Sequence, residues 1–149
     1  MLLNEVFNKE LINLNLKSTI KESAFVELVD AIADLNPVLN REQMLGIIQD
    51  RENKMNSAII SGVAIPHGCY PGINTVIGAL GVSRSGIDYQ TTDKKPVHVV
   101  FMIIMGEGCR ETHLRVLNRI LALINSEVLE FLQKAADPQE VYNMLARFH

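Results

Sequence analysis

A chain of 149 residues, 48% of them hydrophobic, has the size of one compact domain, because at this length folding buries roughly 68–70% of the surface that the unfolded chain exposes. We therefore expect a single domain over residues 1–149. The formal net charge of −3 and the lack of any run of lysines or arginines argue against nucleic acid as a partner, since such binding needs a concentrated positive surface.

The apolar segments are too short to cross a bilayer. The longest of them, such as residues 97–105 with His98 inside, fall well short of the ~20 residues that a spanning helix needs. The acidic, asparagine-rich start lacks the pattern of a signal peptide. The two cysteines, Cys69 and Cys109, are too few for a disulfide framework. We expect a cytoplasmic protein without membrane insertion.

The first stretch of the chain predicts a strand and then a helix. Residues 12–16 alternate leucine or isoleucine with asparagine, which is the period of a half-buried strand. Apolar residues recur at helical spacing over 24–35, and Thr19 with Glu22 three residues later predicts a capping box before them. We expect this helix to cover a sheet.

A second helix and the segment after it lead to a histidine. Asn40 and Gln43 repeat the helix start signal, so we expect a helix that runs to about Arg51 and leaves this arginine near its end. Residues 58–65 are mostly β-branched or small, which predicts short strands or one bent strand. This segment would bring His67 to an edge of the sheet.

The middle of the chain predicts two longer strands. Pro71-Gly72 indicates a turn, residues 75–82 indicate a strand, and residues 83–86 (Ser-Arg-Ser-Gly) indicate the next turn. Residues 97–105 are almost continuously apolar, as in a strand that is buried on both faces. We expect this strand in the middle of the sheet.

Helices fill the C-terminal third of the chain. One follows the loop 106–108 and has His113 at its start, and we expect Ser126 to cap another that runs to Ala135. Asp137, followed by a proline and then by a glutamate, predicts the start of a last helix. Its apolar residues are Val141, Met144, Leu145 and Phe148. These elements predict an α/β fold with a mixed, partly parallel sheet flanked by helices on both faces.

The chemistry is concentrated in the segment Gly62-Val63-Ala64-Ile65-Pro66-His67-Gly68. Proline fixes its own φ and favours an extended Ile65, and Gly68 has no side chain to crowd the ring of His67. An imidazole with a pKa near ~6.5 is largely neutral and nucleophilic in the cytoplasm, so a positioned ring can accept a phosphoryl group. An ordinary turn histidine is the alternative that this segment leaves open.

Three blocks of the sequence together form a family signature. They are Arg51-Glu52 with Ser61 to Gly68, Gly86 to Tyr89 with Asp93 and Pro96 to Phe101, and Thr112 to Leu114 with Leu117. They resemble the fructose, mannitol and nitrogen-regulatory type of enzyme IIA domain in the bacterial phosphoenolpyruvate-dependent phosphotransferase system. The chain departs from the usual family pattern at Ile60 and at residues 56–58.

This resemblance implies a phosphoryl carrier that works without a cofactor. His67 would accept the phosphoryl group from phospho-HPr and pass it to a IIB-type partner, or hold it as a signal for a regulatory target protein. The resemblance also implies that Arg51 and His113 lie beside His67, with Arg51 stabilising the phosphate and His113 supporting the transfer. Sugar transport and regulation without onward transfer both stay open, and a free-standing domain suits either role.

Charge explains why an arginine and a second histidine suit such a site. A phosphoryl group in transfer carries negative charge on its outer oxygens, so the acceptor nitrogen needs cations and hydrogen-bond donors around it. Arg51 supplies a fork of donors, and a helix N-terminus, where we expect His113, favours an anion by ~0.3–1 kcal/mol. A solvated helix-end arginine and a helix-capping histidine are the alternatives. His98, inside an apolar run, is typical of a satisfied core histidine.

A metal site is the alternative from another class of protein. His67, His113, Cys69 and Cys109 form a donor set that suits tetrahedral zinc. Their spacings match neither a zinc finger nor a zinc knuckle, and zinc would compete with phosphate for one ring nitrogen. We expect no bound metal here, and two cysteines that act as small apolar side chains.

A carrier exchanges its phosphoryl group with different proteins through one opening. Each partner has to bring a reacting atom within about 3–3.5 Å of the same ring nitrogen, so the opening around His67 cannot be enclosed. We expect Ile60 and Tyr70 at an apolar rim around this ring, which is the usual form of a transient docking surface.

Overall fold

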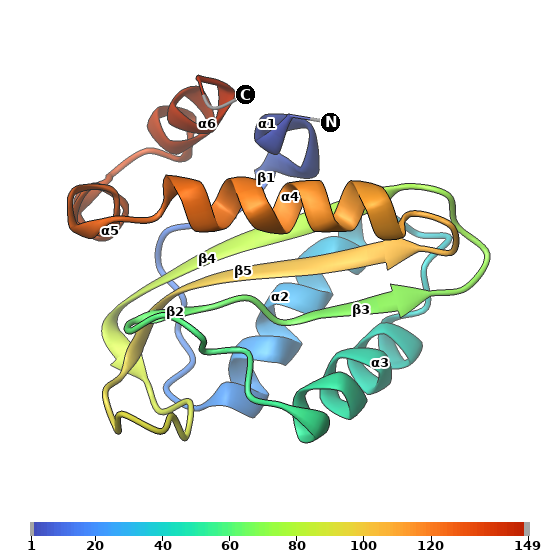
Figure 1. The fold of residues 1–149 in the computed structure, drawn as a ribbon, viewed down its shortest axis with the longest axis horizontal. Helices are drawn as coiled ribbons and strands as arrows, with labels where there is room; N and C mark the ends of the chain where they lie inside the picture. The colour runs from blue at the N-terminus through green and yellow to red at the C-terminus, as the bar shows by residue number, and fades with distance from the viewer. Residues whose placement is uncertain (1, 148–149) are drawn as a thin grey trace.

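The fold is a five-stranded sheet between two layers of helices (Figure 1). The computed structural model describes residues 2–147. The helices are α1 (Leu3–Val6), α2 (Lys21–Leu35), α3 (Arg41–Lys54), α4 (Arg110–Leu123), α5 (Ser126–Lys134) and α6 (Pro138–Ala146). The strands are β1 (Phe7–Asn13), β2 (Val63–Ala64), β3 (His67–Tyr70), β4 (Val76–Ile87) and β5 (Val97–Gly106). The predicted α/β fold with a mixed sheet is confirmed.

Strand β5 lies at the centre of the sheet, as its apolar run predicted. It pairs antiparallel with β4 on one side and parallel with β2 and β3 on the other, while β1 runs parallel to the far edge of β4. Odd-numbered side chains from 99 to 103 face one helix layer and even-numbered ones from 100 to 104 face the other, and all are fully buried. Burial on both faces explains why the segment shows no polar alternation.

The two helix layers enclose two cores. Figure 1 shows α1, α4, α5 and α6 above the sheet and α2 and α3 below it. The upper core includes Phe7 and Phe101, whose rings pack edge to face with centroids 5.5 Å apart, and Ile120 of α4. The lower core includes Phe25 of α2 and Met44 of α3. Within residues 2–147, none of these helices has the length and apolar character that a membrane span requires.

Two helix starts follow their capping signals. The Asn40 side chain accepts a hydrogen bond from the Gln43 N–H at 2.8 Å, and the Asp137 side chain accepts one from the Gln139 N–H at 2.9 Å. Helix α3 continues one turn beyond the expected end at Arg51. Helix α6 has its apolar face at the predicted residues, except that Phe148 lies outside the described part of the chain.

Two other capping predictions are wrong. Helix α2 begins after Ile20, without a side-chain cap, because the Thr19 carbonyl accepts the Asp88 N–H at 2.8 Å and holds this backbone in an extended pairing. Helix α5 is capped by Asn125, whose side chain accepts the Val128 N–H at 2.9 Å, so Ser126 is its first helical residue.

Several strand boundaries differ from the predictions. The first strand lies at Phe7–Asn13, ahead of the alternating residues 12–16, and Leu16 instead donates its N–H to the Val82 carbonyl at 2.9 Å. The predicted turn at 83–86 is a register shift inside β4, where Gly86 has a φ of +95°. A glycine accommodates such a bulge because it has no side chain. Of residues 58–65, only Val63–Ala64 pairs as a strand.

The cap of α5 allows a test of where this helix begins. Asn125→Ala removes the side-chain acceptor for a helix N–H and should reduce the free energy of unfolding by about 1 kcal/mol, which lowers Tm by roughly 2–4 °C in a domain of this size. Ser126→Ala, one residue later, should stay within about 0.5 kcal/mol of wild type. Thermal unfolding of both variants measures this difference. A larger loss for Ser126→Ala would mean that the helix starts as the sequence pattern predicted.

Candidate functional site

The site lies on the edge strand β3, between the two helix layers. Figure 1 shows β3 with α4 above it and α3 below it. Side chains alternate along a strand, and the chain follows this rule here. Gly68 and Tyr70 face the lower layer, where Ile47 of α3 occupies the space that a side chain at residue 68 would need. His67 faces α4.

Two histidine rings meet above this edge. The centroids of His67 and His113 are 4.9 Å apart and the ring planes are tilted by 40°. His67 is half-buried, whereas His113 is only 5% exposed. His113 is the fourth residue of α4 rather than the first or second, and its own N–H donates to the Cys109 carbonyl at 2.8 Å. The expected free helix N–H groups therefore belong to the residues before it.

A hydrogen bond to the backbone identifies the free nitrogen of His67. Its Nδ1 lies 2.9 Å from the Ile65 carbonyl oxygen. A carbonyl only accepts, so Nδ1 carries the proton, and in the neutral ring the lone pair is then on Nε2. Pro66 contributes to this geometry because its carbonyl accepts the Ile103 N–H at 2.9 Å and so ties the segment to β5.

Burial keeps both rings neutral. It is the main cause that lowers the pKa of His67 below its ordinary value, and the Arg51 charge lowers the pKa further, while the Ile65 hydrogen bond and the Glu52 charge oppose this. Burial, followed by the charges of His67 and Arg51, lowers the pKa of His113 to about 4. At neutral pH the pair therefore presents uncharged imidazoles beside a cation.

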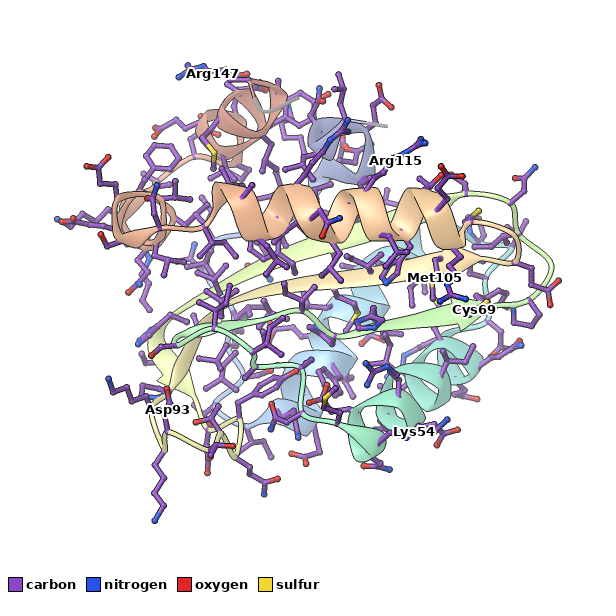
Figure 2. The ribbon with its side chains drawn as sticks, viewed as in Figure 1. Lys54, Cys69, Asp93, Met105, Arg115 and Arg147 are labelled. Atoms are coloured by element: carbon purple, nitrogen blue, oxygen red, sulfur yellow. The ribbon has the colours of Figure 1, made fainter. Side chains whose placement is uncertain are left out.

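Arg51 completes the predicted group. It lies in the last turn of α3, half-buried, with Nη1 3.5 Å from the Met55 carbonyl. Its charge acts on the pKa of both histidines, so the fold brings the three predicted residues together from three separate elements. Figure 2 marks the surroundings, with Cys69 on β3 beside Met105 of β5, and Lys54 at the end of α3.

The expected apolar rim is only partly correct. Ile60 is half-buried and packs against the upper core. Tyr70 is buried in the lower core, and its hydroxyl accepts the Asn40 N–H at 2.9 Å. The rim prediction is wrong for Tyr70 because this residue is three positions from His67, which places the two side chains on opposite faces of a strand.

Residues 2–147 contain no cluster of ligands for the alternative zinc site. Cys69 is exposed and Cys109 is half-buried just before α4, and both are free thiols. Among residues 2–147, no three histidine, cysteine, aspartate or glutamate side chains lie close enough together to hold a metal ion. His98, which the sequence predicted to be a satisfied core histidine, has its Nδ1 2.8 Å from the Ser83 carbonyl and is thus hydrogen-bonded, but it is half-buried rather than in the core.

Glu52 has no predicted role in the sequence, yet the structure places it beside the site. This carboxylate is only 6% exposed, and its Oε2 accepts the Ser57 N–H at 2.9 Å. A signal existed in its spacing, because Met44, Ile48 and Glu52 follow one another at intervals of four and so share the buried face of α3.

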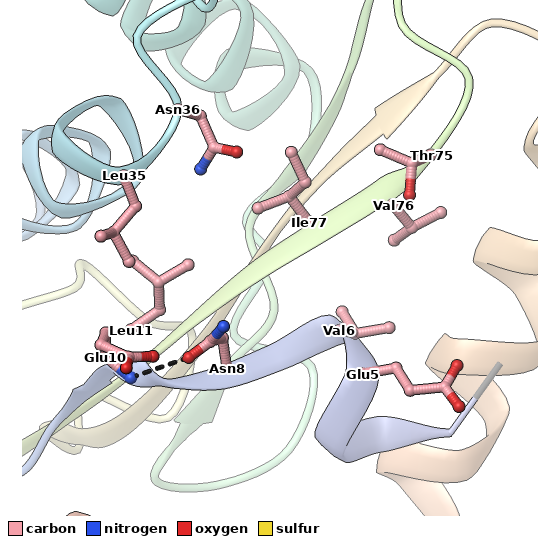
Figure 3. A pocket seen from close by; sticks show the side chains of 10 residues that line it. All are labelled: Glu5, Val6, Asn8, Glu10, Leu11, Leu35, Asn36, Thr75, Val76 and Ile77. Carbon is pink, nitrogen blue, oxygen red and sulfur yellow. Dashed lines mark hydrogen bonds between the residues drawn. The ribbon is translucent and has the colours of Figure 1, made fainter.

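A cavity elsewhere in the molecule is less suited to phosphate. It has a volume of about 450 Å³ and lies where β1 passes the end of α2 and the start of β4 (Figure 3). Its titratable lining residues are the carboxylates Glu5 and Glu10. An anion would be repelled there, whereas the edge beside Arg51 attracts one.

The open edge of the mixed sheet thus carries two neutral histidines beside an arginine. An α/β domain with this arrangement is chemically suited to hold an anionic group on a ring nitrogen. Residues 5–148 match the protein family described as the phosphoenolpyruvate-dependent sugar phosphotransferase system, EIIA 2. The chain belongs to this family.

Curated relatives carry two kinds of name. The fructose-specific EIIABC component of Bacillus subtilis (strain 168) is 34% identical over 127 residues, which are 85% of this chain but 20% of the relative, so the chain spans a fifth of that protein. A nitrogen regulatory protein of Bradyrhizobium diazoefficiens is 32% identical over 132 residues, covering 88% of this chain and 86% of the relative. A fructose-specific EIIA component of Haloferax volcanii is 31% identical over 138 residues, covering 92% and 90%.

Solved structures share the fold. The nitrogen regulatory protein IIA-Ntr of Neisseria meningitidis superposes with a TM-score of 0.88 at 24% identity, over 96% of this chain and 98% of that one. Enzyme IIA mannitol of Escherichia coli, in its complex with phosphorylated enzyme IIB mannitol, superposes with a TM-score of 0.74 at 20% identity, over 93% and 95%. At these identities the likeness establishes the architecture.

The low pKa of His113 predicts a pH-dependent stability. Between pH 6.5 and 4 the unfolded chain binds a proton at this residue and the folded chain does not. The free energy of unfolding should therefore fall by up to about 3 kcal/mol across this window through His113, and stay unaffected by it above pH 6.5. Denaturant unfolding of wild type and His113→Gln across the window measures the difference. Parallel pH profiles for the two proteins would contradict the assignment.

Proposed function

We propose that this chain is a phosphoryl carrier of the phosphotransferase system, with Nε2 of His67 as the acceptor. The observation that carries the proposal is the hydrogen bond from Nδ1 of His67 to the Ile65 carbonyl at 2.9 Å, which leaves the Nε2 lone pair free. The proposed donor is a phospho-HPr-type protein. The proposed recipient is a IIB-type protein or a regulatory target.

The transfer step needs no cofactor. The Nε2 lone pair forms a bond to phosphorus while the bond from phosphorus to the donor breaks, and the electron pair of that bond leaves on the donor. The ring of His67 gains positive charge as the new bond forms. Because Nδ1–H stays hydrogen-bonded to the Ile65 carbonyl, this charge develops against a fixed backbone dipole that stabilises it.

Arg51 and His113 have distinct proposed roles. The Arg51 guanidinium would pair with the outer phosphoryl oxygens, which carry the charge during transfer. His113 would support the group from the α4 side. Its Nδ1 is buried and without a hydrogen-bond partner among residues 2–147, and such an atom is costly to leave unpaired unless a ligand completes it. A phosphoryl oxygen on His67 is one group that would do so.

Two uses of the phosphohistidine are compatible with the relatives. The fructose-specific names favour onward transfer, as does the mannitol domain bound to phosphorylated IIB, whereas the nitrogen regulatory names favour a reporting role. We propose a carrier that serves one of these uses, with regulation without onward transfer as the second candidate. The cytoplasmic location expected from the sequence remains a prediction.

Phosphorylation should depend on His67. Incubation with phospho-HPr should add one acid-labile phosphate to the wild-type chain, and His67→Ala should abolish this gain because it removes the proposed acceptor nitrogen. His98→Ala, a histidine outside the site, is the matched control and should be labelled at the wild-type rate. Intact mass spectrometry before and after acid treatment measures the gain. An acid-labile phosphate that persists in His67→Ala would refute the assignment.

Arg51 should act on the transfer rate rather than on folding. Arg51→Lys keeps the charge but loses the bidentate geometry, so phosphorylation by phospho-HPr should slow by ~10-fold or more. Arg115→Lys changes an exposed arginine of α4 that pairs with Glu111 at 2.7 Å, and it should leave the rate unchanged. Rapid-quench kinetics and thermal unfolding separate the two effects. A variant that unfolds, with normal kinetics in its folded fraction, would instead indicate a structural arginine.

A further inference from the structure

A buried polar cluster lies directly behind the site. Glu52, Ser57 and Tyr89 are all nearly inaccessible. Tyr89 has its hydroxyl 2.6 Å from the Ser57 hydroxyl and donates to Oε1 of Glu52 at 3.4 Å, while Lys21 Nζ lies 3.6 Å from Oε2. A buried carboxylate is costly unless it is paired and hydrogen-bonded. Three separate segments supply what Glu52 needs, so its position is tightly determined.

The cluster connects to His67 through the backbone. The Ser57 N–H donates to Oε2 of Glu52 at 2.9 Å, and the Ser57 carbonyl accepts the Ile65 N–H at 3.0 Å. The Ile65 carbonyl in turn accepts Nδ1–H of His67 at 2.9 Å. Three hydrogen bonds in series therefore lead from the carboxylate to the ring. The N–H and the carbonyl of one residue belong to different peptide groups, so this series fixes positions rather than transmitting charge.

Ser57 anchors a loop whose other residues are largely at the surface. Met55 and Ile59 are among the exposed large hydrophobic residues, and Ser61 is exposed as well. The neighbouring Asn56 donates from Nδ2 to the carbonyls of Tyr89 and Gln90 at 3.0 and 3.2 Å. Without the contact to Glu52, the Ser57 N–H would lose its acceptor, and with it one of the bonds that hold this loop against the sheet edge.

We propose that Glu52 is a positioning residue for phosphoryl transfer, which holds Ser57 and Ile65 so that the ring of His67 keeps its proton on Nδ1 and its lone pair on Nε2. The effect on the transfer rate rests on the function proposed above. The effect on the ring of the unphosphorylated protein does not, so the two can be tested apart.

Two variants of Glu52 distinguish its role as a hydrogen-bond acceptor from the effect of its negative charge. Glu52→Met has a similar volume but offers the Ser57 N–H only a weak thioether acceptor, so nitrogen-15 NMR of His67 should show a mixture of both tautomers in place of Nδ1–H alone. Phosphorylation by phospho-HPr should slow by at least ~10-fold, the scale of a misplaced reacting group. Glu52→Gln keeps an acceptor without the charge, and it should retain the wild-type tautomer and a rate close to that of wild type.

Glu27→Met is the matched control for a purely structural role. Glu27 of α2 is another carboxylate that pins a loop, since it accepts the N–H groups of Lys17 and Ser18 at 3.1–3.2 Å. Its loss should lower the melting temperature without changing the His67 tautomer or the rate. The proposal is overturned if Glu52→Met behaves in this way, or if Glu52→Gln slows transfer as much as Glu52→Met does with the tautomer unchanged.

The wild-type chain provides a test that needs no variant to fold. The amides of Ser57 and Ile65 should exchange with solvent much more slowly than those of Ile59 and Ser61, because both donate to buried acceptors in the series. Equal exchange across the loop would overturn the proposal even if Glu52→Met fails to fold. A protected loop in a chain that phospho-HPr does not label would support the positioning role and refute the proposed function.

Discussion

The hydrogen bond between His67 and the carbonyl of Ile65 is the interaction on which the site depends. It determines which ring nitrogen is protonated, because its acceptor is a backbone carbonyl. Every other feature of the site acts on the nitrogen that this bond leaves free. Burial keeps the ring neutral, Arg51 adds positive charge nearby, and His113 lies against the ring from the opposite layer.

The layered fold explains how these groups meet. Among the described residues, strand β3 pairs with β5 on one side and with no strand on the other. Helices α3 and α4 pack on the two faces of β3. Arg51 and Glu52 come from the end of α3, and His113 comes from the first turn of α4. Because Gly68 lets the Ile47 side chain pack directly against the backbone of β3, this contact holds α3, which carries Arg51, against the strand that carries His67.

Long periodic segments were predictable from the sequence, whereas short edge elements were not. The buried run of β5 and the helix start at Asn40 carry local signals. The serines and glycine at 83–86 suggested a turn, but pairing with β5 continues beyond them, and the chain absorbs the extra residues in a bulge. Tyr70 was misplaced because residues three positions apart in a strand face opposite sides, and the four-residue strand β3 carries no periodic signal that predicts it.

The residues of the site were predictable because they lie in sequence blocks that match a family signature. His67, Arg51 and His113 were identified through family resemblance, and the fold brings them together. The burial of Glu52 was not foreseen, because its partners Lys21 and Tyr89 come from segments that are far away in the sequence and meet it only in the tertiary structure.

The interrupted edge formed by β2 and β3 has a further consequence. In the proposed function a partner protein would reach His67 from the side of the sheet, yet an open strand edge invites pairing with other chains and so aggregation. Here the edge consists of one strand of two residues and another of four, separated by a proline that has no N–H to offer. The Ile65 N–H is already used by the Ser57 carbonyl. The same break that presents the histidine thus keeps an accessible surface from extending into a larger sheet.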